Sequence, residues 1–274
     1  MGLQIATNVG ALNAYRNLSA NQADVSKSLE KLSSGLRINR AADDAAGLAI
    51  SEGLRAQVNG LNVAARNAQD GISVIQTAEG ALTEVHSILQ RVRDLAVQAG
   101  NDSNNAYSRT SIKTEIDTLG DELTRVAAST NFNGIKLLSG GDTLTFQVGA
   151  GSTAAEDQIA VALTDFSGLG ASIKALDVDT AANALTSIAA IDTEIVNVST
   201  ARSGYGAVQN RFESTINSLQ VSAENLSAAK SRIVDTDMAS EMVKYTASNI
   251  LQQAGTAMLA QANQSGQGVL QLLR

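Results

Sequence analysis

The chain has 274 residues, of which 44% are hydrophobic and only 3% aromatic, and it contains no tryptophan, proline or cysteine. The absence of cysteine excludes disulfides and thiolate metal sites, and a net charge of −7 without a large basic patch argues against a nucleic-acid partner. No apolar run approaches the roughly 18 residues of a membrane span, and no basic region followed by an apolar stretch marks a cleavable signal at the N-terminus.

The first predicted element is a helix over residues 3–36, because large aliphatic residues recur in it at intervals of seven. These positions are Ile5, Leu12, Leu18, Val25 and Leu32. Ser33-Ser34-Gly35 is a weak spot near its end. A polar connector follows over residues 37–44, and its charged residues are Arg37, Arg40, Asp43 and Asp44. The two aspartates are expected in the first turn of the next helix, where negative charge is favourable.

The strongest periodic signal lies between Leu54 and Ala99. Apolar residues there alternate in steps of four and three, with a single shift of one residue before Ala78. A 3.5-residue spacing keeps one stripe facing a partner helix, so it predicts a coiled-coil seam. A helix of this length spans roughly 70 Å, which indicates a structural or interaction protein rather than a compact enzyme.

The middle of the chain changes character. Turn-forming residues fill 100–105, a shorter helix follows to about Ser129, and Asn133-Gly134 is a turn signal. Two segments then alternate apolar and polar residues around a glycine-containing loop, which predicts a β-hairpin within residues 131–175. Their apolar positions are Leu144, Phe146 and Val148, and then Ile159, Val161 and Leu163.

Helical spacing returns at about residue 180, with a possible weak point at Ser203-Gly204. A last helix is predicted over 236–272, with Val243, Ile250 and Met258 on one face. The simplest closure pairs the beginning of the chain with its end. The predicted fold class is therefore mostly α: a long antiparallel helical coiled-coil rod with paired N- and C-terminal helices and a small β-hairpin region in the middle. We expect one domain from residues 1–42 with 236–274 and another from 43–235, including the insert at about 131–175.

No motif for catalysis, metal or cofactor stands out. His86 is the single histidine and is best interpreted as a helix-surface residue, because a metal site or a triad needs further partners. Asp235-Thr236-Asp237 resembles a cation site superficially, but negative charge before a helix that begins near Met238 is the simpler interpretation. We expect neither an enzyme nor a bound cofactor.

Several long segments closely resemble the signatures of bacterial flagellin, and together the match covers about 1–140 and 185–274. The segments that carry the resemblance are 32–50, 67–73, 76–82, 90–98, 258–264 and 269–274. The family varies most in its middle, and only some tens of residues separate the two matching halves here. The chain therefore resembles a short flagellin that lacks the large outer domains.

The resemblance implies an extracellular filament subunit used for motility, with terminal helices in an inner core and neighbouring helices in an outer core. It implies secretion in an unfolded state through the flagellar type III channel. The implied partners are further copies of the chain, the hook-associated junction and cap proteins, and an export chaperone at the C-terminal region. The vertebrate Toll-like receptor for flagellin is also implied, with Arg91, Leu95 and Glu115 in the matching motifs. No nucleic acid and no membrane insertion are expected.

The residues themselves suggest why such a chain would assemble. One hairpin pairing cannot cover the apolar rows of both terminal helices, so neighbouring copies would supply the missing surface. The charged connector would then fix the register between copies. The expected interface residues are Ile5, Leu12, Leu18, Val25, Leu32, Arg37, Arg40, Asp43, Asp44, Val243, Ile250, Met258, Leu270 and Leu273.

Two other kinds of protein are alternatives to a filament subunit. An enzyme displayed on a filament would need an H-E-x-x-H motif in the insert, but residues 141–180 contain no histidine. A non-polymerising hook–filament junction protein would share similar terminal helices. The 90–98 motif and the Leu272-Leu273-Arg274 ending favour flagellin itself.

Overall fold

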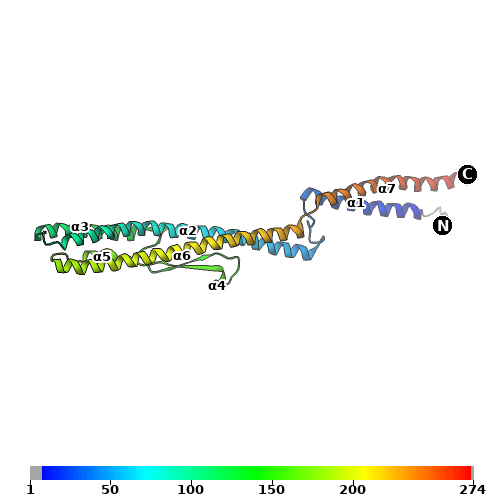
Figure 1. Ribbon diagram of the computed structural model, residues 1–274. Helices are drawn as coiled ribbons and strands as arrows, with labels where there is room; N and C mark the ends of the chain where they lie inside the picture. The colour runs from blue at the N-terminus through cyan, green and yellow to red at the C-terminus, as the bar shows by residue number, and fades with distance from the viewer. Residues whose placement is uncertain (1–7, 273–274) are drawn as a thin grey trace. The chain divides into compact units, whose positions relative to one another are not determined.

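The computed structural model describes residues 8–272, with the backbone alone for 265–272. The helices are α1 (Val9–Ser34), α2 (Ala45–Ala99), α3 (Ala106–Ser129), α4 (Ala154–Asp157), α5 (Leu169–Lys174), α6 (Ala181–Val234) and α7 (Met238–Leu272), as Figure 1 labels them. The strands are β1 (Asn131–Phe132), β2 (Ile135–Lys136), β3 (Thr143–Gln147) and β4 (Gln158–Ala162). The predicted mostly α fold is confirmed.

Contacts divide the chain into two units. The terminal unit contains the residues up to Ala56 and those from Asn225 onward, and the central unit is Gln57–Glu224. Both divisions fall inside long helices, α2 and α6, whereas the expected domain limits at 42/43 and 235/236 fall in the connectors between helices.

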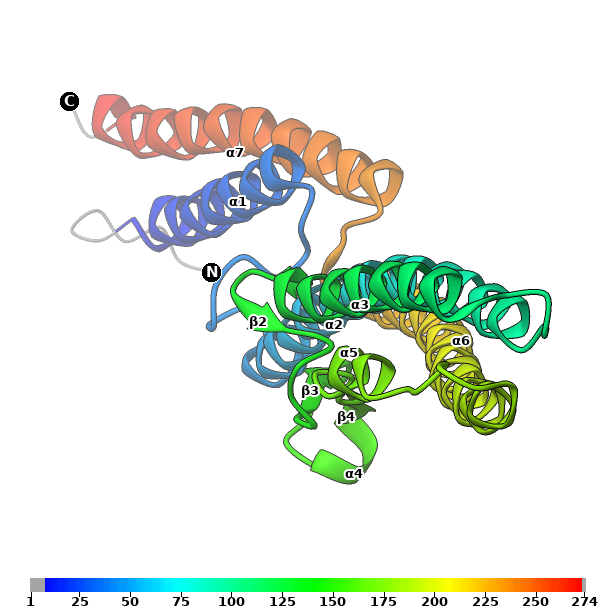
Figure 2. The same ribbon diagram turned by 90° about the vertical axis from the view of Figure 1, so that its left-hand side faces the viewer.

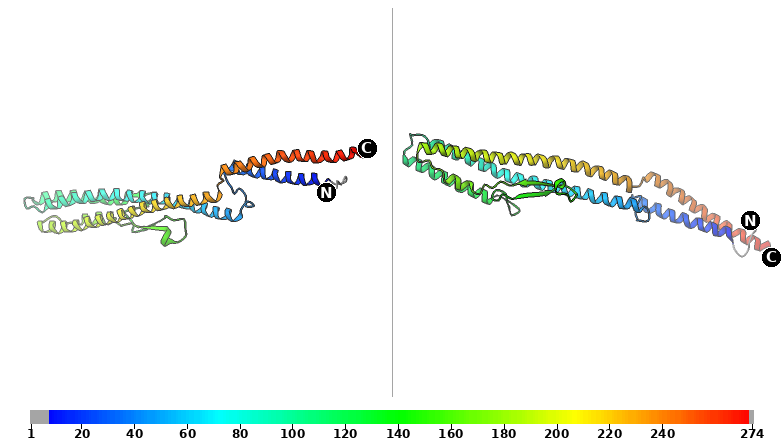
Figure 3. Two further views of the ribbon diagram at one scale, coloured as in Figure 1. Left: turned by 45° about the vertical axis from the view of Figure 1, so that its right-hand side comes forward. Right: turned by 90° about the horizontal axis from the view of Figure 1, so that it is seen from below.

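In the terminal unit, α1 and α7 lie side by side and run antiparallel (Figure 3). The Asn8 side chain donates to the carbonyl of Ala262 at 2.9 Å, near the outer end of the pair. Farther along, Leu18 packs so closely on Gly255 that a Cβ there would lie 3.3 Å from the leucine Cδ1. The predicted pairing of the terminal helices is confirmed.

The connectors that leave α1 and enter α7 are hydrogen-bonded to each other. Gly35 ends α1 in the left-handed conformation, with φ of 72°, and its N–H bonds to the carbonyl of Lys31. Leu36 and Asp235 then form an antiparallel bridge, flanked by a hydrogen bond from the Thr236 N–H to the Gly35 carbonyl. The predicted weak spot is thus the C-terminal cap of α1.

In the central unit, α2 and α6 run antiparallel. Arg93 pairs with Asp192 at 2.6 Å, and farther along the helices Glu79 meets Arg202 at 3.6 Å. Gly71 lies so close to Phe212 that a Cβ on this glycine would come within 2.8 Å of the ring. The ring of Phe212 is fully buried and meets Phe146 edge-on at 5.6 Å.

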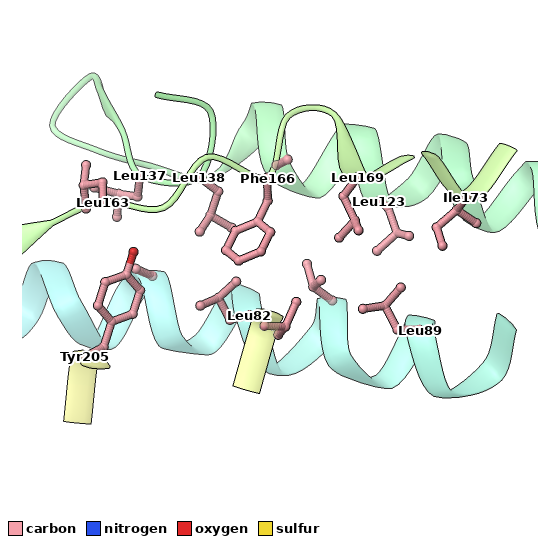
Figure 4. Close-up of a cluster of buried hydrophobic side chains, with 14 of the residues drawn as sticks. Leu82, Leu89, Leu123, Leu137, Leu138, Leu163, Phe166, Leu169, Ile173 and Tyr205 are labelled. Atoms are coloured by element: carbon pink, nitrogen blue, oxygen red, sulfur yellow. The ribbon is translucent and has the colours of Figure 1, made fainter. Parts of the chain in front are cut away.

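The short helix α5 closes the other side of this core against α3. Gly120 of α3 and Gly170 of α5 allow the two helices to lie this close together. A Cβ on Gly170 would lie only 2.3 Å from the carbonyl oxygen of Gly120. Side chains from α3, α5 and the loops beside them meet those of α2 in a continuous apolar cluster (Figure 4). Members labelled there include Leu82, Leu89, Leu123, Leu138, Phe166 and Ile173.

Two small antiparallel sheets complete the central unit, and Figure 2 shows the labelled strands β2, β3 and β4 viewed along the long helices. The predicted hairpin is confirmed by the pairing of β3 with β4, in which Phe146 lies opposite Ile159. The turn at Asn133-Gly134 is also confirmed: it joins β1 to β2, and both residues have positive φ, of 49° and 83°.

One prediction was wrong: α6 is continuous through Ser203-Gly204. A glycine inside a helix costs only about 1 kcal/mol, and the buried neighbours Val198 and Tyr205 anchor the helix on both sides. The 131–175 region also contains α4 and α5, which the alternating pattern did not indicate.

Candidate subunit interface

Helix α7 has two faces, and the more polar one is turned toward α1. The less exposed positions follow steps of four and three, as expected for a helix seam. They are Glu241, Tyr245, Ser248, Gln252, Gly255, Leu259 and Ala262, with Asn249 beside Ser248. The contacts of Glu241 with Ser28 and of Gly255 with Leu18 place this face on α1.

The apolar face of α7 points away from α1 and is covered by nothing within residues 8–264, whose side chains are described. Val243 is 70% exposed, Ile250 61% and Met258 64%, and the intervening Ala247 and Ala254 are exposed as well. We call Val243, Ala247, Ile250, Ala254 and Met258 the α7 stripe. Burying such a stripe is favourable by about 25 cal/mol per Å², so it is suited to a partner surface.

The interface residues expected on α1 divide into two groups. Leu18, Val25 and Leu32 are half-buried on the side toward α7, so α7 of the same chain covers part of each. Leu12 is 51% exposed and remains available. Of the remaining expected positions, Ile5 and Leu273 lie outside the described residues, and for Leu270 only the helical backbone is described.

The charged connector makes its contacts within the chain. Arg37 donates from Nε and Nη2 to the carbonyl of Ile233 at 3.2 and 2.6 Å, and Arg40 pairs with Glu30 at 2.8 Å. Asp44 accepts from the N–H of Gly47 at 2.9 Å and so caps α2. All three side chains are exposed, so each can also contact a residue of another copy.

Asp43 organises the turn of this connector. One of its carboxylate oxygens accepts from the backbone N–H groups of Asn39 and Arg40 at 3.1 and 3.0 Å. The bond from Arg40, followed by that from Asn39, holds the pKa of the Asp43 carboxyl below its ordinary value.

Glu241 is the one feature of this surface that hydrophobic patterning missed. It is only 7% exposed and lies between α1 and α7, where Ser28 is buried as well. The hydrogen bond from Ser28 holds the pKa of the Glu241 carboxyl below its ordinary value of 4.5; burial opposes this shift, and the nearby Lys244 and Lys31 favour it. The 4-3 spacing of the α7 seam could have indicated that Glu241 faces α1. Hydrophobic patterning does not detect this spacing, because the residues of the seam are mostly polar.

The three residues expected to contact a receptor occupy neighbouring helices of the central unit. Arg91 on α2 donates from Nε and Nη2 to Glu115 on α3, at 3.0 and 2.6 Å, and both side chains are about half exposed. Leu95 is 2% exposed and belongs to the core one turn further along α2. The ion pair is therefore accessible from solvent, whereas Leu95 is not.

The described residues show no candidate metal centre. They contain no group of three or more histidine or carboxylate side chains placed to hold a metal ion. Within the same part of the chain, no helix combines the length and apolar character that crossing a membrane requires.

His86 contacts Gln90 through Nε2 at 3.0 Å on the surface of α2. Asp237 caps α7 by accepting from the N–H groups of Ala239 and Ser240.

Comparisons with known proteins agree with this arrangement. Residues 5–143 match the sequence model of the bacterial flagellin N-terminal helical region, and residues 188–273 match that of the C-terminal helical region. A flagellin of Halalkalibacterium halodurans is 53% identical over 97% of this chain and 98% of its own length. A flagellin of Bacillus subtilis is 49% identical over 99% of this chain and 100% of its own length.

Solved structures show the same fold. The crystal structure of Bacillus cereus flagellin has a TM-score of 0.50 and 33% identity, and the match covers 60% of this chain and 94% of that one. A putative flagellar hook-associated protein from Vibrio parahaemolyticus, at 17% identity and a TM-score of 0.59, shares the fold over 70% of this chain and 100% of its own. The chain therefore belongs to the bacterial flagellin family, whose members are structural subunits of the extracellular flagellar filament and not enzymes.

Proposed function

We propose that the α7 stripe, together with the exposed apolar residues of α1, is the surface through which copies of this chain assemble into the filament. The observation that carries the proposal is the orientation of α7, which pairs with α1 through its polar seam and leaves the stripe exposed. A row of aliphatic side chains with 61–70% exposure at its three largest members is stabilised by association. Repeated non-closing contacts of this kind produce a helical polymer.

The test is to place charge on the stripe without altering the α1 seam. We expect Val243→Glu with Ile250→Glu to abolish seeded polymerisation, because two carboxylates would have to be buried between copies. Light scattering and sedimentation after addition of filament fragments measure the effect. Gln253→Glu is the matched control, since Gln253 is exposed on the same helix outside both the stripe and the seam. Normal filaments from the double variant would contradict the proposal.

The charged connector has a secondary place in this proposal. Arg37, Arg40, Asp43 and Asp44 remain proposed as contacts that set the register between copies, in addition to their bonds within the chain. Exposed ion pairs contribute little, about 0–1 kcal/mol each, so the apolar stripe dominates the free energy of assembly. Arg40→Ala should therefore change the salt dependence of polymerisation more than its extent, and an unchanged salt dependence would exclude Arg40 from the interface.

A second proposed role is recognition by the vertebrate Toll-like receptor for flagellin through Arg91 and Glu115, with Leu95 supporting them from the core. The exposed guanidinium of Arg91 and its carboxylate partner favour this assignment. Arg91→Ala should reduce receptor activation in reporter cells at least about tenfold, the loss expected when a central arginine is truncated. Arg125→Ala, which removes an exposed arginine from α3, is the control. Equal activation by both variants would contradict the assignment.

The remaining partners are proposed from membership of the family. The chain would leave the cell unfolded through the flagellar type III channel, with an export chaperone bound to the region of α7, and would meet hook-associated junction and cap proteins at the filament ends. The absence of proline favours rapid refolding after such transit, since no X-Pro bond has to isomerise. Secretion from a strain that lacks the export apparatus would contradict this route.

A further inference from the structure

The central unit carries a groove of about 760 Å³ that α6 borders on one side and β4, α5 and the loop between them border on the other. Its apolar floor includes Val161, Phe166 and Tyr205, each almost completely buried. Along α6 its wall extends from Glu194 to Val208, a length of about 21 Å. Three alanines and two glycines are among the other lining residues.

The charged groups that line this groove are both acidic. Asp165 accepts from the N–H of Ser167 at 2.8 Å, and Glu194 accepts from the Asn197 side chain at 3.2 Å. Neither carboxylate forms an ion pair with another described residue, and no arginine or lysine is among the lining residues. A carboxylate offers about four acceptor positions, so both retain capacity for a guanidinium.

The same unit presents basic groups that match this charge. Eight of its arginines and lysines each bond to a carboxylate or a carbonyl within the chain. They are Arg91, Arg93, Arg109, Lys113, Arg125, Lys136, Lys174 and Arg202. Arg66 on α2 and Arg211 on α6 are exposed, and among the described residues their guanidinium groups have no hydrogen-bonding or ionic partner.

The two arginines lie on neighbouring parts of adjacent helices. Arg211 directly precedes Phe212, whose ring contacts Gly71, and Arg66 lies five residues before that glycine. Arg211 and Glu194 are 17 residues apart on one continuous helix, a separation of about 26 Å. Val208 at the near end of the groove is only three residues before Arg211, but the Arg211 guanidinium cannot reach the Glu194 carboxylate of its own chain.

We propose that this groove receives the Arg66–Arg211 region of a second copy, with the guanidinium groups on Asp165 and Glu194. The inference rests on the proposed self-assembly and adds a specific contact between central units. A copy displaced by about 26 Å along α6 brings Arg211 level with Glu194. The contact joins two different surfaces, so it continues from copy to copy and suits a filament rather than a closed dimer.

Charge reversal in complementary pairs tests this contact. The groove variant is Asp165→Arg with Glu194→Arg, and the arginine variant is Arg66→Glu with Arg211→Glu. We expect each alone to raise the critical concentration for seeded polymerisation at least about tenfold, because like charges then face each other. An equimolar mixture should polymerise within about threefold of the unmodified chain, since each groove then meets a region of opposite charge.

Two further variants keep the test sharp. Asp142→Arg with Glu156→Arg makes the same change of charge outside the groove and should polymerise normally. Asp165→Asn with Glu194→Gln preserves the shape of the groove, and its critical concentration should rise with less dependence on salt than that of the unmodified chain. Circular dichroism verifies that each variant is folded.

The outcomes separate this contact from the α7 stripe. Polymerisation of the groove variant at the unmodified concentration, or no recovery in the mixture of folded variants, would overturn the contact and leave the stripe untouched. Normal polymerisation of the stripe variant would instead overturn the proposed assembly surface. Recovery in the mixture, with normal polymerisation of the control, would support the contact.

Discussion

At the scale of single residues, Glu241 shows how a buried carboxylate can contribute to helix pairing. It lies in the seam between α1 and α7, where the Ser28 hydroxyl donates to it and Lys244 approaches within 3.5 Å. Burying an ionised carboxylate without such partners would cost several kcal/mol. The surrounding donors favour the charged form, so the ionised Glu241 contributes to the pairing of the terminal helices.

This arrangement predicts a loss of helix pairing in acid. The pKa of Glu241 in the folded chain lies below its ordinary value of 4.5, so its stabilising contribution is complete above about pH 4.5 and is lost as the pH falls through the lower, folded value. In the unmodified monomer, amide hydrogen exchange in α1 and α7 should therefore accelerate below about pH 4.5, after correction for the intrinsic rate.

The variant Glu241→Gln should remove this part of the pH dependence. We expect it to weaken the pairing by about 1 kcal/mol at neutral pH, the typical net value of one hydrogen bond. Glu224→Gln is the control, because Glu224 is exposed and has no bonded partner among the described residues. An unchanged acid response in Glu241→Gln would show that other groups govern the pairing.

At the scale of elements, α7 shows that a helix need not turn its most apolar face toward its neighbour in the same chain. Its seam contains Glu241, Ser248 and Gln252, and the Glu241 carboxylate accepts a hydrogen bond from Ser28 of α1. The more apolar stripe remains exposed. Such an inversion is costly for an isolated monomer and favourable for a subunit whose stripe will be buried by other copies.

Elements of the central unit follow the usual pattern, with their apolar faces inward. Gly71 admits the Phe212 ring between α2 and α6, and Gly120 with Gly170 permits the close crossing of α3 and α5. At these glycines the paired elements approach closely, and side chains fill the space between them. The surfaces proposed above for assembly are the groove, the two unpaired arginines and the α7 stripe.

At the scale of the whole molecule, the two units differ in how their apolar surface is covered. The contiguous core cluster runs from Ala68 to Phe212 and lies entirely in the central unit. The terminal unit contains the α1–α7 pair, in which α7 presents mostly polar residues to α1. The helix propensity of the residues contributes little to the stability of an isolated helix pair. The stability of the terminal unit is therefore expected to depend on contacts with other copies of the chain.

Truncation tests this division of roles. Deleting residues 1–35 or 240–274 should leave a folded, soluble chain that does not polymerise, because neither deletion removes a member of the core cluster. Circular dichroism, analytical sedimentation and seeding with filament fragments measure these properties. If either truncated chain formed normal filaments, the terminal helices would have no essential part in assembly.

Local sequence signals predicted most of the elements. The 4-3 spacing between Leu54 and Ala99 predicted α2, the alternation around Phe146 and Ile159 predicted β3 and β4, and Asn133-Gly134 predicted a tight turn. These signals succeed because side-chain period and turn chemistry are properties of short segments. The continuity of α6 through Gly204 was missed, because burial of the neighbouring residues offsets the local cost of glycine.

The sequence by itself determined the helical class, the antiparallel closure of the two ends and the membership of the flagellin family, since each is encoded in periodicity or in long continuous motifs. Only the tertiary structure decided which face of α7 meets α1, that Leu95 is buried while the Arg91–Glu115 pair is exposed, and that Asp165 and Glu194 share one groove. These facts depend on helix rotation and on contacts between residues distant in the chain. An apolar stripe has the same period whether it faces its own chain or a neighbouring copy.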